Sequence, residues 1–219
     1  MEKIRLIIFD LDGTLVDSSR DITNALNYAL NPYGFKAMTV EETVKLVGEG
    51  ITRLIEKVIG TEKIGIKDDV LKRFLEFYSD HLTEYTRPYP GVRETLDNLS
   101  AYKKAVISNK REELSRRLLE ELGMASCFNH ILGSDSTSEK KPSPLPVLTV
   151  LSREGLTPDQ ALMVGDSNLD IEAGSNAGVI TVGAGYGYRP LEALKRADFL
   201  IRERLSELPE ILKKIQTQS

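Results

Sequence analysis

Four acidic residues follow two runs of apolar residues. Asp10 and Asp12 end one run near the N-terminus, and Asp166 and Asp170 follow a second run in the C-terminal half. Such runs are typical of strands covered on both faces of a parallel sheet, and ligands bind outside the carboxyl ends of these strands. Because carboxylates that share a site repel one another, a cation is expected between them. Ligation by oxygen alone suits Mg²⁺, which binds through carboxylates together with a substrate phosphate.

Further polar residues could hold that phosphate. A third apolar run ends in Ser108 and Asn109, and Lys141 precedes the proline-containing turn 142–144. Proline restricts the backbone, so Lys141 should be held more rigidly than an ordinary surface lysine. Each position has a structural alternative, since Asp, Ser and Asn at strand ends often cap the next helix, and Lys140 with Lys141 could be a solvated pair. The convergence of three strand ends on one edge of the sheet favours a binding site.

Composition and the other reactive side chains argue against several classes of function. The two histidines, His81 and His130, lie far apart and lack metal-ligand spacing, so zinc is not expected. The single cysteine, Cys127, is interpreted as a small core residue. With a formal net charge of -4 and no basic stripe, the chain is not expected to bind nucleic acid. The first apolar run is too short for a signal peptide or a membrane span, which predicts a cytoplasmic protein without a membrane partner.

The order of the apolar runs predicts an α/β core. Helical patterns, among them 112–122 and 144–154, alternate with the runs at lengths that suit β-α-β crossovers. This alternation indicates a doubly wound, Rossmann-like parallel sheet. Strands are expected at 4–9, 105–107, 130–132, 161–164 and 179–182.

The connection between the first two expected strands is too long for a single crossover. Most of it follows a helical period and lacks strand patterns. The segment Arg87-Pro88-Tyr89-Pro90-Gly91 cannot continue a helix and marks the return to the core. We therefore predict a core of residues 1–17 and 86–219 and an inserted helical domain of residues 18–85. The apolar faces of the insertion are Ile22, Ala25, Leu26, Ala29 and Leu30, and Leu54, Ile55, Val58 and Ile59.

Four segments, in order, resemble the motifs of the haloacid-dehalogenase-like phosphatase superfamily. The segment Asp10-Leu11-Asp12-Gly13-Thr14-Leu15-Val16-Asp17-Ser18 is similar to the first motif, and Ser108-Asn109 to the second. Lys141-Pro142 resembles the third motif, and Gly165-Asp166-Ser167-x-x-Asp170 resembles the fourth. The resemblance spans nearly the whole core. It implies a magnesium-dependent phosphatase that acts on a small phosphorylated metabolite.

The resemblance also implies a role for each matching residue. Asp10 would be the nucleophile that forms an aspartyl-phosphate, and Asp12 would be the general acid and base. The metal ligands would be Asp10, the main-chain carbonyl of Asp12, and Asp166, while Asp170 would orient the metal shell or Lys141. The phosphoryl oxygens would be held by Ser108, Asn109 and Lys141.

These roles agree with elementary chemistry. A carboxylate that attacks an anionic phosphate needs the phosphoryl charge neutralised, which Mg²⁺ and Lys141 can do. Covalent capture divides one displacement into two. Asp12 lies two residues after the nucleophile, across a turn that Gly13 permits, so it can protonate the leaving oxygen and later take a proton from water.

The insertion resembles the cap domain of the superfamily's first cap class, which closes over the site and selects the substrate. Two segments, Asp17-Ser18-x-x-Asp21-Ile22 and Val47-Gly48-Glu49-Gly50, further resemble the phosphoglycolate phosphatase branch. The resemblance implies 2-phosphoglycolate as the substrate, and its carboxylate requires polar or cationic groups. We expect cap contacts to the substrate from Glu49, Gly50 and Arg53.

The motifs are compatible with other functions. A dehalogenase of this fold does not use a second acidic residue such as Asp12, and β-phosphoglucomutase-like relatives carry a histidine where this chain has Ile22. Another small-metabolite phosphatase or a pyrophosphatase would share the motifs. A catalytically silent phosphate-binding module would keep the fold without turnover. The glycine-rich segment 183–187 lacks the full dinucleotide fingerprint, and we expect it to be a mobile loop beside the site.

Overall fold

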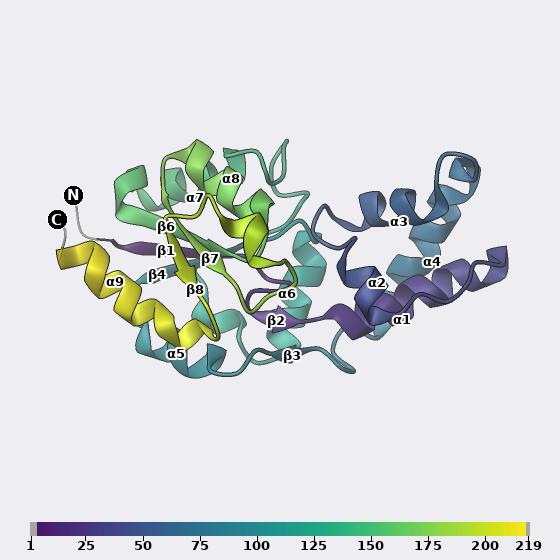
Figure 1. Ribbon diagram of the computed structural model, residues 1–219, viewed down its shortest axis with the longest axis horizontal. Helices are drawn as coiled ribbons and strands as arrows, with labels where there is room; N and C mark the ends of the chain where they lie inside the picture. Colours follow the sequence, from purple (N-terminus) through teal and green to yellow (C-terminus); the bar gives the residue numbers. More distant parts are fainter. Residues whose placement is uncertain (1–3, 218–219) are drawn as a thin grey trace.

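Six parallel strands form the centre of the computed structural model, which describes residues 4–217 (Figure 1). Five of them lie where the apolar runs predicted strands, and the predicted doubly wound sheet is confirmed. The sixth, at the sheet edge between Asp198 and Arg202, was not predicted; of its three residues only Ile201 is buried, and Leu200 is exposed. In sheet order the strands are β5 (His130–Leu132), β4 (Lys103–Ile107), β1 (Leu6–Phe9), β6 (Ala161–Gly165), β7 (Ile180–Ala184) and β8 (Phe199–Ile201).

Strands β1 and β6 are neighbours at the centre of the sheet, where the strand order reverses. From β1 the chain passes outward to β4 and β5, and then returns to β6 on the other side of β1. Phe9 at the end of β1 is in register with Val106 and with Val164. Ligands of open α/β sheets bind at this switch point, outside the carboxyl ends of the strands. Asp10 and Asp166, which directly follow β1 and β6, are therefore placed together.

Helices cover both faces of the sheet, with α7 and α8 on one face and α5, α6 and α9 on the other (Figure 1). The side chains of β1 alternate between the layers: Ile7 and Phe9 pack with α5, α6 and α9, and Leu6 and Ile8 pack with α7 and α8. All four are buried, which explains why this strand is a continuous apolar run. The core helices are α5 (Val92–Asn98), α6 (Glu112–Glu121), α7 (Leu145–Glu154), α8 (Asn168–Ala177) and α9 (Leu208–Thr217), with short 3-10 turns η3 (Ala125–Cys127), η4 (Pro158–Gln160), η5 (Leu191–Leu194) and η6 (Leu205–Glu207).

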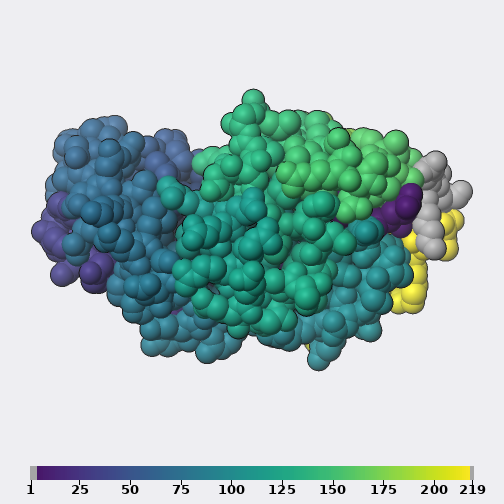
Figure 2. Space-filling model, turned by 180° about the vertical axis from the view of Figure 1, so that it is seen from behind, coloured from purple at the N-terminus to yellow at the C-terminus, as the bar shows by residue number. Residues whose placement is uncertain are grey.

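The inserted helices form a lobe beside the core, beyond the carboxyl ends of the strands (Figures 1 and 2). We call this lobe the cap. It packs around its own apolar cluster, which includes Leu26, Leu54 and Phe74, and Leu114 from the core helix α6 joins that cluster. The cap consists of α1 (Ser19–Leu30), α2 (Val40–Val44), α3 (Ile51–Ile59) and α4 (Lys67–Asp80), with 3-10 turns η1 (Asn31–Tyr33) and η2 (Ile64–Ile66).

Two short strands join the cap to the core. β2 (Val16–Asp17) and β3 (Arg87–Pro88) pair antiparallel, so the chain leaves and re-enters the core at one place. Buried Asp21 fixes the return, because its carboxylate accepts hydrogen bonds from the N–H groups of Tyr85 and Thr86 and from the Thr86 hydroxyl at 2.7 Å. The expected domain boundaries lie next to this two-stranded ribbon.

The residues expected to be structural have ordinary partners. His81 donates to the Phe77 carbonyl at 2.7 Å, and His130 lies 2.7 Å from the Glu154 carboxylate. Cys127, expected in the core, is half-buried and packs against the core cluster. Within residues 4–217, no helix combines the length and the apolar character needed to cross a membrane.

Candidate active site

The loop after β1 carries Asp10 and Asp12 in a tight turn. The turn is closed by hydrogen bonds to the Leu11 carbonyl. Gly13 has a φ of 89°, and a Cβ at this position would lie 2.3 Å from Oδ2 of Asp166. Both the backbone conformation and the close approach therefore require glycine. The two aspartates line one cavity as a result.

Lys141 joins two of the carboxylates. Its ammonium lies 2.7 Å from Oδ1 of Asp10 and 2.6 Å from Oδ1 of Asp170, and it donates a third hydrogen bond to the Ile107 carbonyl at 2.7 Å. An ammonium has three donors, so all of them are used. Burial alone would lower the pKa of Lys141, but Asp10 and Asp170 raise it above its ordinary value. Lys141 is therefore a fixed, buried cation, and the alternative of a solvated surface lysine is excluded for it.

Asp10, Asp166 and Asp170 form a cluster of oxygen donors that could hold a metal ion. One carboxylate oxygen from each lies within 4.8 Å of the others. Burial, followed by the charge of Asp170, raises the pKa of Asp10 to about 7. Burial, followed by the charge of Asp10, raises the pKa of Asp166 well above its ordinary value. A cation between Asp10 and Asp166 would favour their charged forms and so lower both pKa values. The sequence predicted Asp10 and Asp166 as ligands with the Asp12 carbonyl, and Asp170 as a supporting residue.

The glycine-rich segment after β7 encloses Asp166. A Cβ on Gly187 would lie 2.3 Å from the Cβ of Asp166, and the Tyr188 N–H donates to Oδ2 of Asp166 at 2.7 Å. The Tyr188 hydroxyl accepts a hydrogen bond from the Ser18 N–H at 2.8 Å and also contacts Asp17 at 3.1 Å. This segment therefore lies beside the site, as predicted, and connects Asp166 to the start of the cap.

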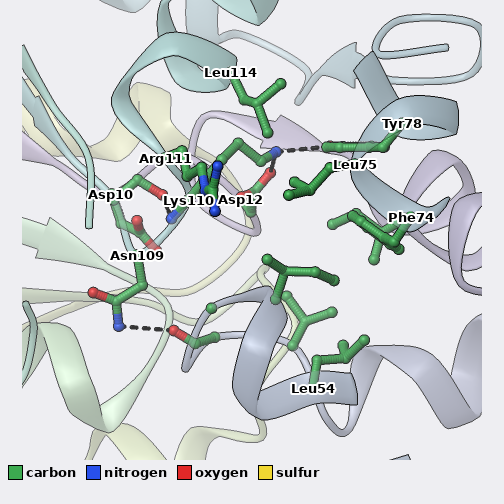
Figure 3. A pocket seen from close by; sticks show the side chains of 16 residues that line it. Asp10, Asp12, Leu54, Phe74, Leu75, Tyr78, Asn109, Lys110, Arg111 and Leu114 are labelled. Carbon is green, nitrogen blue, oxygen red and sulfur yellow. Dashed lines mark hydrogen bonds and ion pairs between the residues drawn. The ribbon is translucent and has the colours of Figure 1, made fainter. Parts of the chain in front are cut away.

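Asp12 is bound by a lysine that was not among the predicted site residues. Nζ of Lys110 lies 2.7 Å from Oδ1 of Asp12 and 2.8 Å from the hydroxyl of Tyr78, on cap helix α4 (Figure 3). The Ser18 hydroxyl donates to the same Asp12 oxygen. Burial alone would lower the pKa of Lys110, but Asp12 and Tyr78 raise it, so the lysine stays charged. Its position immediately after the predicted Ser108-Asn109 pair was the signal that could have identified it.

Ser108 and Asn109 line the same cavity but are bonded differently. The Ser108 hydroxyl accepts a hydrogen bond from the Lys110 N–H at 3.2 Å and keeps its own proton to donate. The Asn109 amide donates to the Gly48 carbonyl at 2.9 Å and to the Lys141 carbonyl at 3.0 Å. Its Oδ1 is buried without a hydrogen-bond partner among the described residues. Ser108 can donate to a phosphoryl oxygen, whereas the Asn109 amide nitrogen already ties the cap to the Lys141 turn.

A cavity of about 70 Å³ lies between the core and the cap (Figure 3). The core wall is mostly polar and consists of Asp10, Asp12, Ser108, Asn109, Lys110, Arg111 and Leu114. The side chains of the cap wall are apolar apart from one hydroxyl; the wall consists of Ile22, Val47, Gly48, Gly50, Ile51, Leu54, Phe74, Leu75 and Tyr78. That hydroxyl, on Tyr78, is already bonded to Lys110. Charged groups therefore reach the cavity from the core wall.

Core side chains bind main-chain carbonyls of residues 44–50, which we call the cap loop. Arg189 donates to three of these carbonyl oxygens, two of them at 3.0 Å. Lys140 donates to a fourth at 2.6 Å, and Asn109 to a fifth at 2.9 Å. A Cβ on Gly50 would lie 2.9 Å from the Asn109 carbonyl oxygen, so the loop packs closely on the core. These contacts dock the cap over the site.

The cap residues predicted to contact the substrate take different positions. Gly50 lines the cavity, whereas Glu49 and Arg53 are not among its lining residues. Arg53 bonds to Glu56 at 2.7 Å and lies 3.9 Å from Glu49, which also bonds to Lys57. Pairs at these spacings are common on exposed helix surfaces. A substrate contact by Glu49 or Arg53 stays a prediction.

The chain is similar to known proteins along most of its length. Residues 7–184 match the family model described as haloacid dehalogenase-like hydrolase. A phosphoglycolate phosphatase of Aquifex aeolicus is 40% identical over 211 residues, covering 95% of this chain and 97% of the relative. One of Neisseria gonorrhoeae is 37% identical over 226 residues, covering 100% and 96%. The crystal structure of a predicted phosphoglycolate phosphatase from Haemophilus somnus superposes with a TM-score of 0.87 at 30% identity, covering 96% of this chain and 99% of that one.

Proposed function

The chain belongs to the haloacid dehalogenase-like hydrolase family, and from this premise we propose that it hydrolyses 2-phosphoglycolate to glycolate and phosphate through an aspartyl-phosphate on Asp10. The names of its relatives agree with the predicted phosphoric monoester hydrolase.

One observation carries the proposal. Asp10 is a buried carboxylate, bonded to the fixed cation Lys141, in a cavity that Asp12 also lines. The arrangement supplies a nucleophile, a positive charge beside it and a second carboxyl group for proton transfer. Phosphoryl transfer needs these three groups close together.

The acidic cluster fits a magnesium ion. The ion would be held by Asp10, Asp166 and the main-chain carbonyl of Asp12, all of which offer hard oxygen donors. The raised pKa values of the two aspartates support a cation, because a positive charge would relieve the repulsion between them. Gly13 and Gly187 let the main chain pack directly against Asp166, because a Cβ at either position would collide with it. When bound, Mg²⁺ supplies charge neutralisation to the phosphoryl group.

In the first step, an oxygen of Asp10 attacks phosphorus while the ester P–O bond breaks. The leaving alkoxide takes a proton from the carboxyl group of Asp12, so the alcohol departs neutral. Lys141 lies next to the Asp10 carboxylate and stabilises the charge on the phosphoryl group. The Ser108 hydroxyl can donate a further hydrogen bond to a phosphoryl oxygen.

In the second step, water attacks the phosphorus of the aspartyl-phosphate. Asp12, now a carboxylate, accepts a proton from the water as the bond between phosphorus and the Asp10 oxygen breaks. Phosphate leaves, and both aspartates return to their starting states. Lys110 and Ser18 fix the orientation of Asp12 for both transfers. The apolar cap wall keeps bulk water away until the leaving group has gone.

The test is an assay of the purified protein with a panel of phosphorylated metabolites, ranked by kcat/KM. We expect 2-phosphoglycolate in the leading group, release of glycolate and phosphate in equal amounts, loss of activity with a chelator and recovery with Mg²⁺. Full activity in chelator would contradict the metal site. A lead of tenfold or more by hexose phosphates or pyrophosphate, about 1.4 kcal/mol, would overturn the substrate assignment and leave the phosphatase assignment standing.

A further inference from the structure

The positive charges around the cavity are distributed unequally between its two walls. Among the lining residues, which all lie within residues 4–217, the cationic side chains are Lys110 and Arg111, both from the core. The cap cations nearby are engaged elsewhere, since Arg53 and Lys57 bond to glutamates on the cap surface. A ligand that carries an anionic group besides its phosphate would therefore meet its counter-charge on the core wall.

Arg111 is a free guanidinium at this wall. It lies between Lys110 and helix α6, is exposed and lines the cavity. Among residues 4–217, no side chain or carbonyl bonds to its guanidinium. Arg116 and Arg117, on the same helix, are each bonded to a glutamate. An unpaired arginine presents a planar set of donors that matches a carboxylate in a bidentate manner.

Lys110 adds a further donor next to Arg111. Two of its three N–H groups are used, one by Asp12 and one by the Tyr78 hydroxyl. The third is available to an anionic ligand in the cavity. The Asp10 carboxylate lines the same cavity, so a short molecule could present its phosphoryl group to Asp10 and its second anionic group to Lys110 and Arg111.

The side chains of the cap wall offer no positive charge to an anionic group. They are hydrocarbon apart from the Tyr78 hydroxyl, and burying a charge against hydrocarbon is unfavourable. Leu54, Phe74 and Leu75 can instead contact the carbon atoms of a leaving group. The volume of about 70 Å³ suits a compact molecule.

We propose that Arg111, assisted by Lys110, binds the carboxylate of the substrate, so that the core and not the cap recognises this second anionic group. This inference rests on the proposed function. It assigns to Arg111 the role that the sequence suggested for Arg53.

The test compares 2-phosphoglycolate with ethyl phosphate, which has a methyl group in place of the carboxylate. For the unaltered protein we expect a higher kcat/KM with 2-phosphoglycolate. Arg111→Met should lower the ratio of the two kcat/KM values by about tenfold or more, since a hydrogen bond to a charged group is lost. The value for ethyl phosphate should change little, and Arg111→Lys should restore part of the ratio. Arg116→Met, an exposed arginine of α6, is the matched control and should leave the ratio unchanged.

Arg53→Met is the rival variant. A larger fall of the ratio in Arg53→Met than in Arg111→Met would overturn the inference and support the cap arginine. An unchanged ratio in Arg111→Met, or equal use of both substrates by the unaltered protein, would also overturn it while the phosphatase function stands. Hydrolysis of neither substrate would overturn the proposed function, and this inference with it. Because Arg111 is exposed, its substitution should not affect folding, which circular dichroism can verify.

Discussion

The two walls of the cavity are built from different kinds of structure. The polar groups of the core wall directly follow strands β1 and β4, so the sheet fixes where each side chain begins. The cap wall consists of apolar side chains on cap helices and the cap loop, and several of them belong to the apolar cluster of the cap (Figure 3). The sheet therefore places the reacting groups, while the cap sets the shape of the ligand space and excludes water. The walls meet at the contact of Lys110 with Tyr78 and at the hydrogen bond from Asn109 to the Gly48 carbonyl.

The largest effect should come from the core wall, at the nucleophile. Asp10→Asn keeps the shape of the side chain but removes the attacking carboxylate, so we expect turnover to fall below detection and Mg²⁺ to bind more weakly. Phosphate release and magnesium titration measure the two effects. Asp97→Asn, an exposed change on α5, is the control. Fast turnover by Asp10→Asn would refute the covalent scheme.

The next effect should come from the contact between the walls. Lys110→Met removes the cation that orients Asp12, and we expect kcat to fall about 100-fold, within the range of general acid–base catalysis. Lys104→Met is a matched control, because Lys104 is also a buried lysine but donates to the Leu99 carbonyl away from the cavity. Equal values of kcat in the two variants, measured per folded molecule, would show that Lys110 has only a structural role.

A change confined to the cap wall should alter selectivity more than chemistry. Leu54→Ala and Leu30→Ala both remove buried cap side chains, and each should lower the free energy of unfolding by about 2–5 kcal/mol. Only Leu54 lines the cavity, so only Leu54→Ala should raise the kcat/KM of a bulkier phosphomonoester relative to 2-phosphoglycolate, by about tenfold. The same shift in both variants would contradict the division between the walls.

The smallest effect concerns stability and distinguishes the core site from the cap. The pKa of Asp10 is raised from 3.8 to about 7, so the folded protein keeps a proton that the unfolded chain releases. Without metal, this aspartate should therefore destabilise the fold progressively as the pH rises from about 4 to about 7. Bound Mg²⁺ should offset the cost of the ionised Asp10 carboxylate, so adding Mg²⁺ should raise Tm more at pH 8 than at pH 5. Asp10→Asn does not titrate there and should lose much of this difference; an undiminished difference in that variant would contradict the assignment to Asp10.

The sequence predicted the core wall more fully than the cap wall, for a physical reason. A buried strand and the polar residues that follow it are both visible along the chain, so Asp10, Asp12 and Ser108 could be placed at one edge of the sheet. A helical period shows only which side of a helix is apolar. Leu54 was correctly expected on an apolar face, but whether it lines a cavity depends on how the cap packs on the core.

Charged residues were the harder part of the site to predict. Arg53 was expected to contact the substrate because it is cationic, and this contact stays a prediction; in the structure its ion-pair partners are Glu49 and Glu56. Lys110 was not predicted, because its burial depends on Tyr78, 32 positions away in the sequence and on the cap. Contacts between the two domains leave no local pattern in the sequence. They can be identified only once the packing of the cap on the core is known.

The way in which the core holds the cap loop has a consequence for evolution. Arg189, Lys140 and Asn109 all bind main-chain carbonyl oxygens of residues 44–50. Every amino acid carries that oxygen, so the attachment does not depend on which side chains the loop presents. Substitution of Val47 would remodel the ligand space and leave the attachment intact, provided that glycines with positive φ persist at positions 48 and 50. New substrate preferences can therefore arise in this loop by single substitutions, without a compensating change in the core.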